Sequence, residues 1–139
     1  MITNVIDLLT LHEGYRSKPY RDTLGYLTVG IGRNLDTRGI SRDEAQYMLK
    51  NDIVMAEYLL AMHPFWNSLS MVRKAVLLDM MVNIGPSRFN GFKRTLEFIR
   101  NKDYLAASKE MLVSKWAQQV GQRATRLSRM METNEWPKE

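Results

Sequence analysis

Two acidic residues and a threonine near the N-terminus have the types and spacing that cleavage of a glycosidic bond could use. Eight residues separate Glu13 from Asp22, and five separate Asp22 from Thr28. Such cleavage needs one carboxyl group that keeps its proton and another that stays ionised. A nearby hydroxyl could orient a water molecule. Each residue alone has an ordinary explanation, namely an exposed glutamate, a turn-stabilising aspartate and a strand threonine.

A short helix predicted over residues 4–13 would place Glu13 in its final turn. Thr3 or Asn4 can cap the N-terminus, and Gly14 suits the left-handed conformation that often ends a helix. The negative end of the helix dipole disfavours a carboxylate there, and an apolar helix face would draw the side chain toward a core. Both effects favour the protonated form, which a general acid must keep.

The segment from about residue 15 to 35 predicts a small antiparallel hairpin or meander. A proline and three glycines disfavour a helix, and residues 26–31 are rich in strand-forming types. Residues 22–25 have turn composition. We therefore expect Asp22 in a polar turn, ionised and partly solvated, and Thr28 on the returning strand.

The rest of the chain predicts helices, the first opened by the capping box of Ser41 and Glu44. The expected helices cover about 41–62, 68 or 70 to 84, 92–101, 104–115 and 122–131, with Gly85-Pro86 ending the second. We expect one α+β, predominantly helical domain over residues 1–139, with two lobes. Residues 14–40 would form the small β lobe, residues 1–13 and 41–139 the helical part, and the active cleft would lie between them.

Composition narrows the function classes. The 139 residues include no cysteine, so a disulfide framework and thiolate chemistry are excluded. Two isolated histidines, His12 and His63, do not predict a metal site. The net charge of +5 favours acidic partners such as a bacterial wall polymer. Neither an export signal nor a run of apolar residues long enough to span a membrane is visible.

Glycines and aromatics stand in register with the three candidate residues. Residues 12–32 read HEGYRSKPYRDTLGYLTVGIG. This segment resembles the catalytic segment of phage-type lysozymes, the endolysins of glycoside hydrolase family 24. That family has an E-G pair closing the first helix, a Y-x-D-x-x-G turn and a T-[IV]-G-[IFY]-G strand. Asn83-Ile84-Gly85 with 89–92 resembles its [NQ]-x-G…G-F segment, and Ser114-Lys115-Trp116 with Arg123-Ala124 resembles its S-x-W…R-A segment.

The resemblance implies a muralytic enzyme that hydrolyses the β-1,4 bond between N-acetylmuramic acid and N-acetylglucosamine in peptidoglycan. The implied site consists of catalytic Glu13, Asp22 and Thr28 and substrate-binding Gly32, Asn83 and Arg123. Glu13 would protonate the leaving oxygen. Asp22 would stabilise positive charge on the sugar or, with Thr28, position the attacking water. Asn83 would line the cleft and Arg123 would lie against Glu13. The resemblance favours water attack with inversion.

The implied biology is lysis of a bacterial host. The enzyme would accumulate in the host cytoplasm and reach the wall after a separate protein permeabilises the membrane. We expect a monomer with no metal or cofactor, no nucleic-acid partner and no stable insertion into a membrane.

Two departures from the family pattern and one conflict bear on the site. Arg33 replaces a histidine that many members have, which affects local packing, and the loop from Asn34 to Gly39 is short, which implies a small hairpin lobe and a more open cleft. A guanidinium beside Glu13 would favour the ionised carboxyl. We hypothesise that Arg123 positions Glu13, while bound saccharide excludes water and restores the proton.

Two other classes of protein are open alternatives. One is a lysozyme fold that binds wall glycan without cutting it, against which the intact candidate residues argue. The other is a basic helical nucleic-acid binder that uses residues 123–129, which leaves the first 35 residues unexplained.

Overall fold

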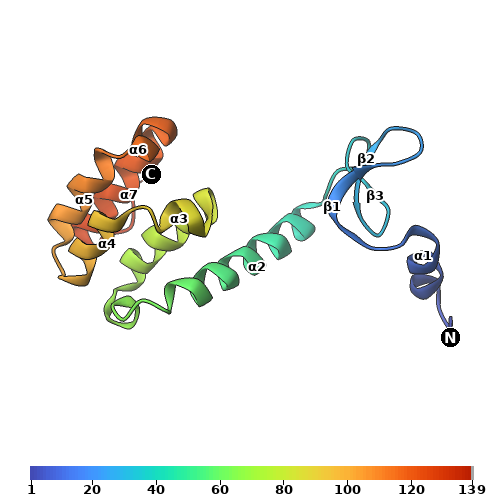
Figure 1. Cartoon of the computed structure of the whole chain (residues 1–139), viewed down its shortest axis with the longest axis horizontal. Coiled ribbons are helices and arrows are strands. Elements are labelled where there is room, and N and C mark those ends of the chain that lie inside the picture. Colours follow the sequence, from blue (N-terminus) through green and yellow to red (C-terminus); the bar gives the residue numbers. More distant parts are fainter. Residues whose placement is uncertain (139) are drawn as a thin grey trace. The chain divides into compact units, whose positions relative to one another are not determined.

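The computed structural model describes residues 1–138, which form two compact units, Met1–Met48 and the residues from Leu49 onward (Figure 1). The N-terminal unit holds one helix and a small sheet, and the C-terminal unit is helical. Helix α2, Arg42–Leu60, begins in the first unit and continues into the second.

The N-terminal unit begins with helix α1, Val5–Glu13. The side chain of Asn4 accepts a hydrogen bond from the Asp7 backbone N–H at 2.8 Å, which satisfies one of the free donors at the helix start. Gly14 ends the helix and donates its N–H to the Thr10 carbonyl. Its φ of 69° is positive as expected, but its ψ of 174° is not that of a left-handed helical residue. The chain therefore leaves the helix directly into an extended conformation.

Three antiparallel strands follow in the order β1-β2-β3. They are β1, Arg16–Arg21, β2, Leu27–Gly30, and β3, Arg33–Asn34. Tyr20 pairs with Thr28, and the register shifts between Arg16 and Tyr20. Pro19 lies in this irregular stretch, where its missing N–H does not interrupt a regular ladder. Of the predicted hairpin or meander, the structure has the meander, with three antiparallel strands.

The C-terminal unit has further helices besides the end of α2. They are α3, Met71–Phe89, α4, Lys93–Arg100, α5, Tyr104–Leu112, α6, Lys115–Val120, and α7, Gln122–Thr133, with a 3-10 turn at Trp66–Ser68. Helix α7 packs against α3, α5 and α6 (Figure 1). Sequence analysis missed the 3-10 turn and α6, and it extended the previous helix to residue 115.

The predicted break at Gly85-Pro86 is present, but the helix resumes after it. Gly85 has φ 82° and ψ 164°, outside the helical region, and Pro86 begins a further turn that runs to Phe89. A proline is well tolerated in the first turn of a helix, because its missing N–H would have no partner there. The expectation that the chain stays non-helical after Gly85 was therefore wrong.

The buried apolar residues form one hydrophobic cluster, and all of its members lie in the C-terminal unit. It contains Ala56, Leu60, Phe65, Trp66, Leu69, Val72, Val76, Leu77, Met80, Met81, Phe89, Leu96, Ile99, Ala107, Met111, Trp116, Ala124, Leu127, Met130 and Met131. Burial of this apolar surface is the main stabilising contribution to the unit. The fold is α+β and predominantly helical, as predicted. Among residues 1–138, no helix combines the length and apolar character needed to span a membrane.

Candidate active site

The six predicted site residues are divided between the two units. Glu13, Asp22, Thr28 and Gly32 belong to the N-terminal unit, and Asn83 and Arg123 belong to the C-terminal unit. Within each unit the structure gives these residues definite partners.

Glu13 is the last residue of α1, and its carboxyl group contacts the backbone at Gly32. A Cβ atom built on Gly32 would lie 2.5 Å from Glu13 Oε2 and 2.7 Å from its Cδ. Gly32 also has φ 74°, a conformation that other residues rarely adopt. Because Gly32 has no Cβ atom, the Glu13 carboxyl group can occupy the space beside its backbone. Within the N-terminal unit, Glu13 is exposed and no residue of α1 is buried, so this unit by itself does not cover the carboxyl group.

Asp22 opens the turn between β1 and β2. Its Oδ1 accepts hydrogen bonds from the backbone N–H groups of Leu24 and Tyr26, each at 2.9 Å. Its backbone N–H donates to the Tyr26 carbonyl at 2.9 Å, and its carbonyl accepts from Gly25 at 2.9 Å. The carboxylate is thus held in one orientation through one oxygen. The turn-stabilising function considered for Asp22 is real, and it leaves Oδ2 available for another function.

Thr28 lies on β2 between Tyr20 of β1 and Asn34 of β3. It is 3% exposed, and its hydroxyl donates a hydrogen bond to the Tyr26 carbonyl at 2.9 Å. Because the hydroxyl proton is already used, the oxygen can act toward a water molecule only as an acceptor. Tyr26 therefore contacts both candidate residues. Its carbonyl accepts the hydrogen bond from Thr28, and its N–H donates to Asp22 Oδ1.

Arg33, the departure from the family pattern, makes an ion pair with Glu44. Arg33 Nη1 donates to Glu44 Oε1 at 2.7 Å and to the Gly39 carbonyl at 3.2 Å, and Nη2 lies 2.5 Å from Glu44 Oε2. Glu44 Oε1 also accepts from the Ser41 N–H at 2.8 Å, and Ser41 Oγ accepts from the Glu44 N–H at 3.1 Å. The hydrogen bond from Arg33, assisted by that from the Ser41 backbone, lowers the pKa of Glu44 to about 2.

In the C-terminal unit, Asn83 of α3 is engaged by a tryptophan. Trp116 donates its Nε1–H to Asn83 Oδ1 at 3.2 Å and is 2% exposed. Its ring packs edge to face against Phe92, with ring centroids 5.9 Å apart. Since a buried indole N–H needs an acceptor, this contact fixes the Asn83 carbonyl and leaves its amide donors for other partners.

Arg123, near the start of α7, pairs with Asp79 of α3. Arg123 Nε donates to Asp79 Oδ1 at 2.8 Å, and both side chains are about two-fifths exposed, at 41% and 40%. The terminal nitrogens of the guanidinium remain for another acceptor. Sequence analysis did not identify Asp79, although it lies one helical turn before Asn83 on α3.

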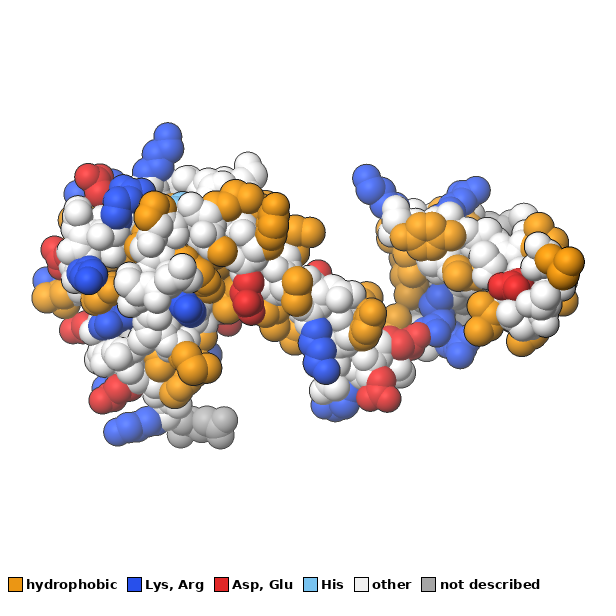
Figure 2. Space-filling model, turned by 90° about the horizontal axis from the view of Figure 1, so that it is seen from below, with side chains coloured by type: hydrophobic (Ala, Val, Ile, Leu, Met, Phe, Trp, Pro, Cys, Tyr) orange, Lys and Arg blue, Asp and Glu red, His pale blue; other side chains and the backbone are white. Residues whose placement is uncertain are grey.

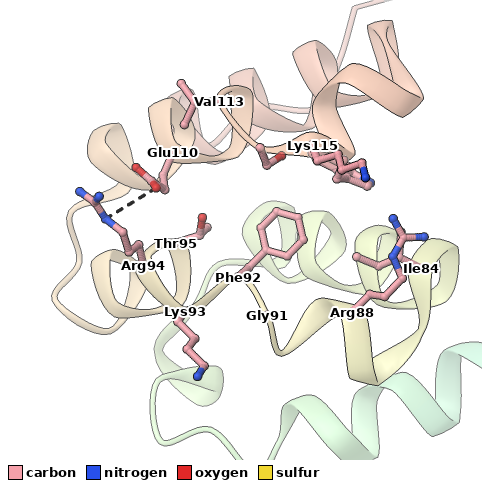
Figure 3. Close-up of a pocket in the computed structure, with 12 residues that line it drawn as sticks. Ile84, Arg88, Gly91, Phe92, Lys93, Arg94, Thr95, Glu110, Val113 and Lys115 are labelled. Carbon is pink, nitrogen blue, oxygen red and sulfur yellow. Dashed lines mark ion pairs between the residues drawn. The ribbon is translucent and has the colours of Figure 1, made fainter.

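A pocket of about 480 Å³ opens in the C-terminal unit around Phe92 (Figure 3). Arg88 and Lys115 lie on one side of the phenyl ring, and Arg94 lies on the other, paired with Glu110 at 3.6 Å. Basic side chains outnumber the acidic one, so the rim attracts carboxylates. This pocket was not anticipated from the sequence, because its walls come from four separate helices, α3, α4, α5 and α6.

Lys and Arg side chains do not form one continuous stripe on the face seen in Figure 2. Over the C-terminal unit they alternate with Asp and Glu. Helix α7, which carries residues 123–129, buries Ala124, Leu127 and Ser128 and pairs Arg123 with Asp79. Half of this helix therefore packs in the core rather than presenting an uninterrupted basic surface.

No group of three or more potential ligands among residues 1–138 is arranged to hold a metal ion. The candidate catalytic residues of the N-terminal unit offer two carboxyl groups and a hydroxyl group. Glu13 can exchange a proton, Asp22 offers a fixed carboxylate oxygen, and Thr28 offers an acceptor oxygen.

Comparison with known proteins agrees with this chemistry. The model of the phage lysozyme family matches residues 10–132, most of the chain. Two curated relatives from Dictyostelium discoideum, named probable T4-type lysozyme 1 and probable T4-type lysozyme 2, are each 26% identical to this chain. Each alignment covers 96% of this chain and 96% of the relative. The match contains both the first helix end with Glu13 and the segment with Arg123. The chain therefore belongs to the phage lysozyme family and is a glycoside hydrolase of the lysozyme type.

Proposed function

We propose that this lysozyme hydrolyses the β-1,4 bond between N-acetylmuramic acid and N-acetylglucosamine in bacterial peptidoglycan. The observation that carries the proposal is the pair of carboxyl groups with unlike surroundings in the N-terminal unit. Glu13 lies at a helix C-terminus against the bare backbone of Gly32, and Asp22 is hydrogen-bonded within a turn. Two carboxyl groups in different environments are what acid-assisted glycoside cleavage requires.

In the proposed reaction, Glu13 donates its proton to the leaving oxygen as the glycosidic bond breaks. Asp22 stabilises the positive charge that develops on the sugar, through the oxygen not used in the turn. Thr28 accepts a hydrogen bond from the attacking water, and the free Asp22 oxygen takes the proton that this water gives up as its oxygen bonds to the anomeric carbon. Attack from the face opposite the leaving group gives inversion at the anomeric carbon.

We also propose that Gly32, Asn83 and Arg123 take part in substrate binding. Gly32 would let the saccharide approach the backbone next to Glu13. Asn83 has amide donors left after its contact with Trp116, and Arg123 has guanidinium donors left after its contact with Asp79. These amide and guanidinium groups could donate hydrogen bonds to hydroxyl or carbonyl groups of the sugar. The basic pocket around Phe92 would receive carboxylates of the wall polymer.

The biological role we propose is lysis of a bacterial host, with one catalytic domain acting as a monomer after the membrane has been permeabilised. The relatives from Dictyostelium discoideum are named as lysozymes, and their names give no host. Clearing of permeabilised but not of intact bacteria would support the proposed role, and equal clearing of both would count against it. A solution mass above the 16.2 kDa of one chain would count against the monomer.

The decisive experiment compares the wild-type protein with Glu13→Gln on permeabilised bacteria. Glutamine keeps the shape of the side chain but cannot donate the carboxyl proton, so the lytic rate should fall by roughly 10²–10⁴-fold. Unchanged clearing would remove Glu13 from the mechanism. If the variant still binds wall material but does not cut it, loss of folding is excluded as the cause.

Product analysis completes this test. NMR of the fresh product should show the reducing-end anomer opposite in configuration to the β bond that was cleaved. The β anomer as first product would indicate retention and would refute the direct attack of water.

A further inference from the structure

The position of the Glu13 carboxyl group depends on how the chain around Gly32 is held. Gly32 and Gly30 both have positive φ, 74° and 70°, so the turn between β2 and β3 bends sharply at two residues without side chains. The strand that follows, β3, consists of only Arg33 and Asn34. Such a short edge strand provides little pairing to fix the turn. Some other contact must hold Gly32 against Glu13.

The ion pair between Arg33 and Glu44 supplies this contact. Both guanidinium Nη atoms meet the two carboxylate oxygens, at 2.7 and 2.5 Å, which is the two-point geometry that restricts orientation most strongly. Arg33 is the residue immediately after Gly32. Its guanidinium also donates to the Gly39 carbonyl at 3.2 Å, so it ties both ends of the loop.

Glu44 is itself fixed by the start of α2. Its Oε1 accepts the Ser41 N–H at 2.8 Å while Ser41 Oγ accepts the Glu44 N–H at 3.1 Å. The side chain of Arg33 is 24% exposed and that of Glu44 is 42% exposed, so the pair is partly shielded from water. The Ser41 backbone N–H, at the start of a 19-residue helix, thus anchors the carboxylate to which the turn is attached.

We propose that Arg33 and Glu44 are positioning residues for catalysis, which act through Gly32 to set where the Glu13 carboxyl group lies. Neither residue is assigned a contact with substrate. The inference rests on the proposed function of Glu13 as general acid. It gives the substitution at Arg33 a catalytic consequence, whereas the sequence predicted an effect on local packing more than on catalysis.

The competing explanation is that the pair merely stabilises the N-terminal unit. Four variants separate the two explanations. Arg33→Gln and Glu44→Gln break the charged pair, and Arg33→Lys keeps the charge but loses the two-point geometry. Ser41→Ala removes the side-chain cap of α2 but leaves the carboxylate and the guanidinium in place, so it is the matched control for stability.

The rate constants should distinguish positioning from stability. We expect Arg33→Gln and Glu44→Gln each to lower kcat by roughly ten- to a hundredfold on soluble peptidoglycan fragments, the size of effect produced by a misplaced reacting group. KM should change by no more than about twofold, because substrate contacts are untouched. Arg33→Lys should recover part of kcat. The double variant, Arg33→Gln with Glu44→Gln, should lose no more kcat than either single variant, because the two residues act as a unit.

A carboxyl ¹³C NMR signal provides a readout independent of turnover. The Glu13 signal, assigned by its loss in Glu13→Gln, should move in Arg33→Gln and Glu44→Gln and stay in place in Ser41→Ala. If Arg33→Gln does not fold, Arg33→Lys gives the same comparison with the charge retained. Wild-type kcat in folded pair variants, or an equal loss of kcat in Ser41→Ala, would overturn the proposal.

Failure of this inference is distinguishable from failure of the proposed function. If Glu13→Gln is inactive while the Arg33 and Glu44 variants turn over normally, only the positioning proposal is wrong. If Glu13→Gln keeps full activity, Glu13 is not the general acid and the positioning proposal falls with it.

Discussion

At the scale of the residue, the site depends on the missing side chain of Gly32 as much as on the reactive groups. Glu13 is one of 15 acidic residues, and nothing in its type distinguishes it from the others. What distinguishes it is the contact of its carboxyl group with Gly32, where any side chain would collide with it. A glycine beside an acidic group is therefore part of the active site, although it carries no chemistry of its own.

Replacement of Gly32 by alanine should impair catalysis more than stability. The new Cβ would meet the end of the flexible Glu13 side chain, which can move away at little energetic cost but then leaves its position. The positive φ adds a destabilisation on the order of 1 kcal/mol. We expect kcat to fall by about tenfold or more, as for other small misplacements of a reacting group.

Gly30→Ala is the matched control for this change. Gly30 has nearly the same φ, 70°, but a Cβ built there meets no atom within 4 Å. Denaturant titration should show similar losses in both variants, while kcat should fall substantially only in Gly32→Ala. Equal kcat values in the two variants would show that backbone strain, rather than the contact with Glu13, accounts for the effect.

At the scale of the element, the start of α2 performs two tasks with one side chain. Glu44 completes the capping box with Ser41 and binds Arg33. Arg33 lies three residues beyond the end of β2 and 11 residues before Glu44 in the chain. Sequence analysis predicted the first task correctly, because a capping box is a local pattern. It could not predict the second, because the pairing depends on where the intervening loop returns.

The stability of the protein should depend on pH through Glu44. Its pKa lies at about 2 in the folded protein, below the ordinary value of 4.5, so the ionised form favours folding. This contribution is fully present above pH 4.5, falls as the pH drops and is lost near pH 2. Thermal unfolding should therefore show a Tm difference between wild type and Glu44→Gln that shrinks through this window.

The same measurement on Arg33→Gln identifies the partner. Without the guanidinium, Glu44 loses the largest cause of its lowered pKa, so the additional effect of Glu44→Gln should become smaller in this background. A Tm difference that is equally large in both backgrounds at every pH would show that Ser41, not Arg33, is responsible.

At the scale of the whole molecule, two properties can be compared, namely where apolar side chains are buried and how charge is distributed. The buried apolar cluster is confined to the C-terminal unit, which contains every member from Ala56 to Met131. The 20 basic and 15 acidic residues give a net charge of +5. On the face shown in Figure 2, basic and acidic side chains are mixed over the C-terminal unit. The net positive charge predicts a general attraction to acidic polymers.

Lysis of whole walls should weaken as salt rises. Attraction between a basic protein and an acidic wall is screened beyond about 10 Å at 0.1 M ionic strength. We expect the clearing rate of permeabilised bacteria to fall as NaCl is raised from about 20 to about 200 mM. These concentrations lie below and above the roughly 0.1 M at which the screening length is about 10 Å. Hydrolysis of short soluble peptidoglycan fragments is the control and should change much less, because each fragment carries few of the carboxylates of the wall. An identical salt response for both substrates would assign the effect to the catalytic step.

The sequence alone determined the local structure and the family. The helix starts at Asn4 and Ser41 and the turn at Asp22 follow from side chains that bond to neighbours a few residues away. The break at Gly85 follows from the backbone freedom of glycine and the missing N–H of the next residue, proline. The order of motifs identified the lysozyme resemblance, which the family match over residues 10–132 confirmed. Errors arose where such signals were weak, as in the turn after Pro86 and in helix α6.

Only the tertiary structure decided which residues meet. The contact of Glu13 with Gly32, the pair of Arg33 with Glu44 and the pair of Arg123 with Asp79 join residues 11 to 44 positions apart. Their distances depend on loop closure and packing summed over many residues, which no local pattern encodes. For this reason the sequence could nominate Glu13 as an acid, whereas the backbone that receives its carboxyl group became visible only in the folded chain.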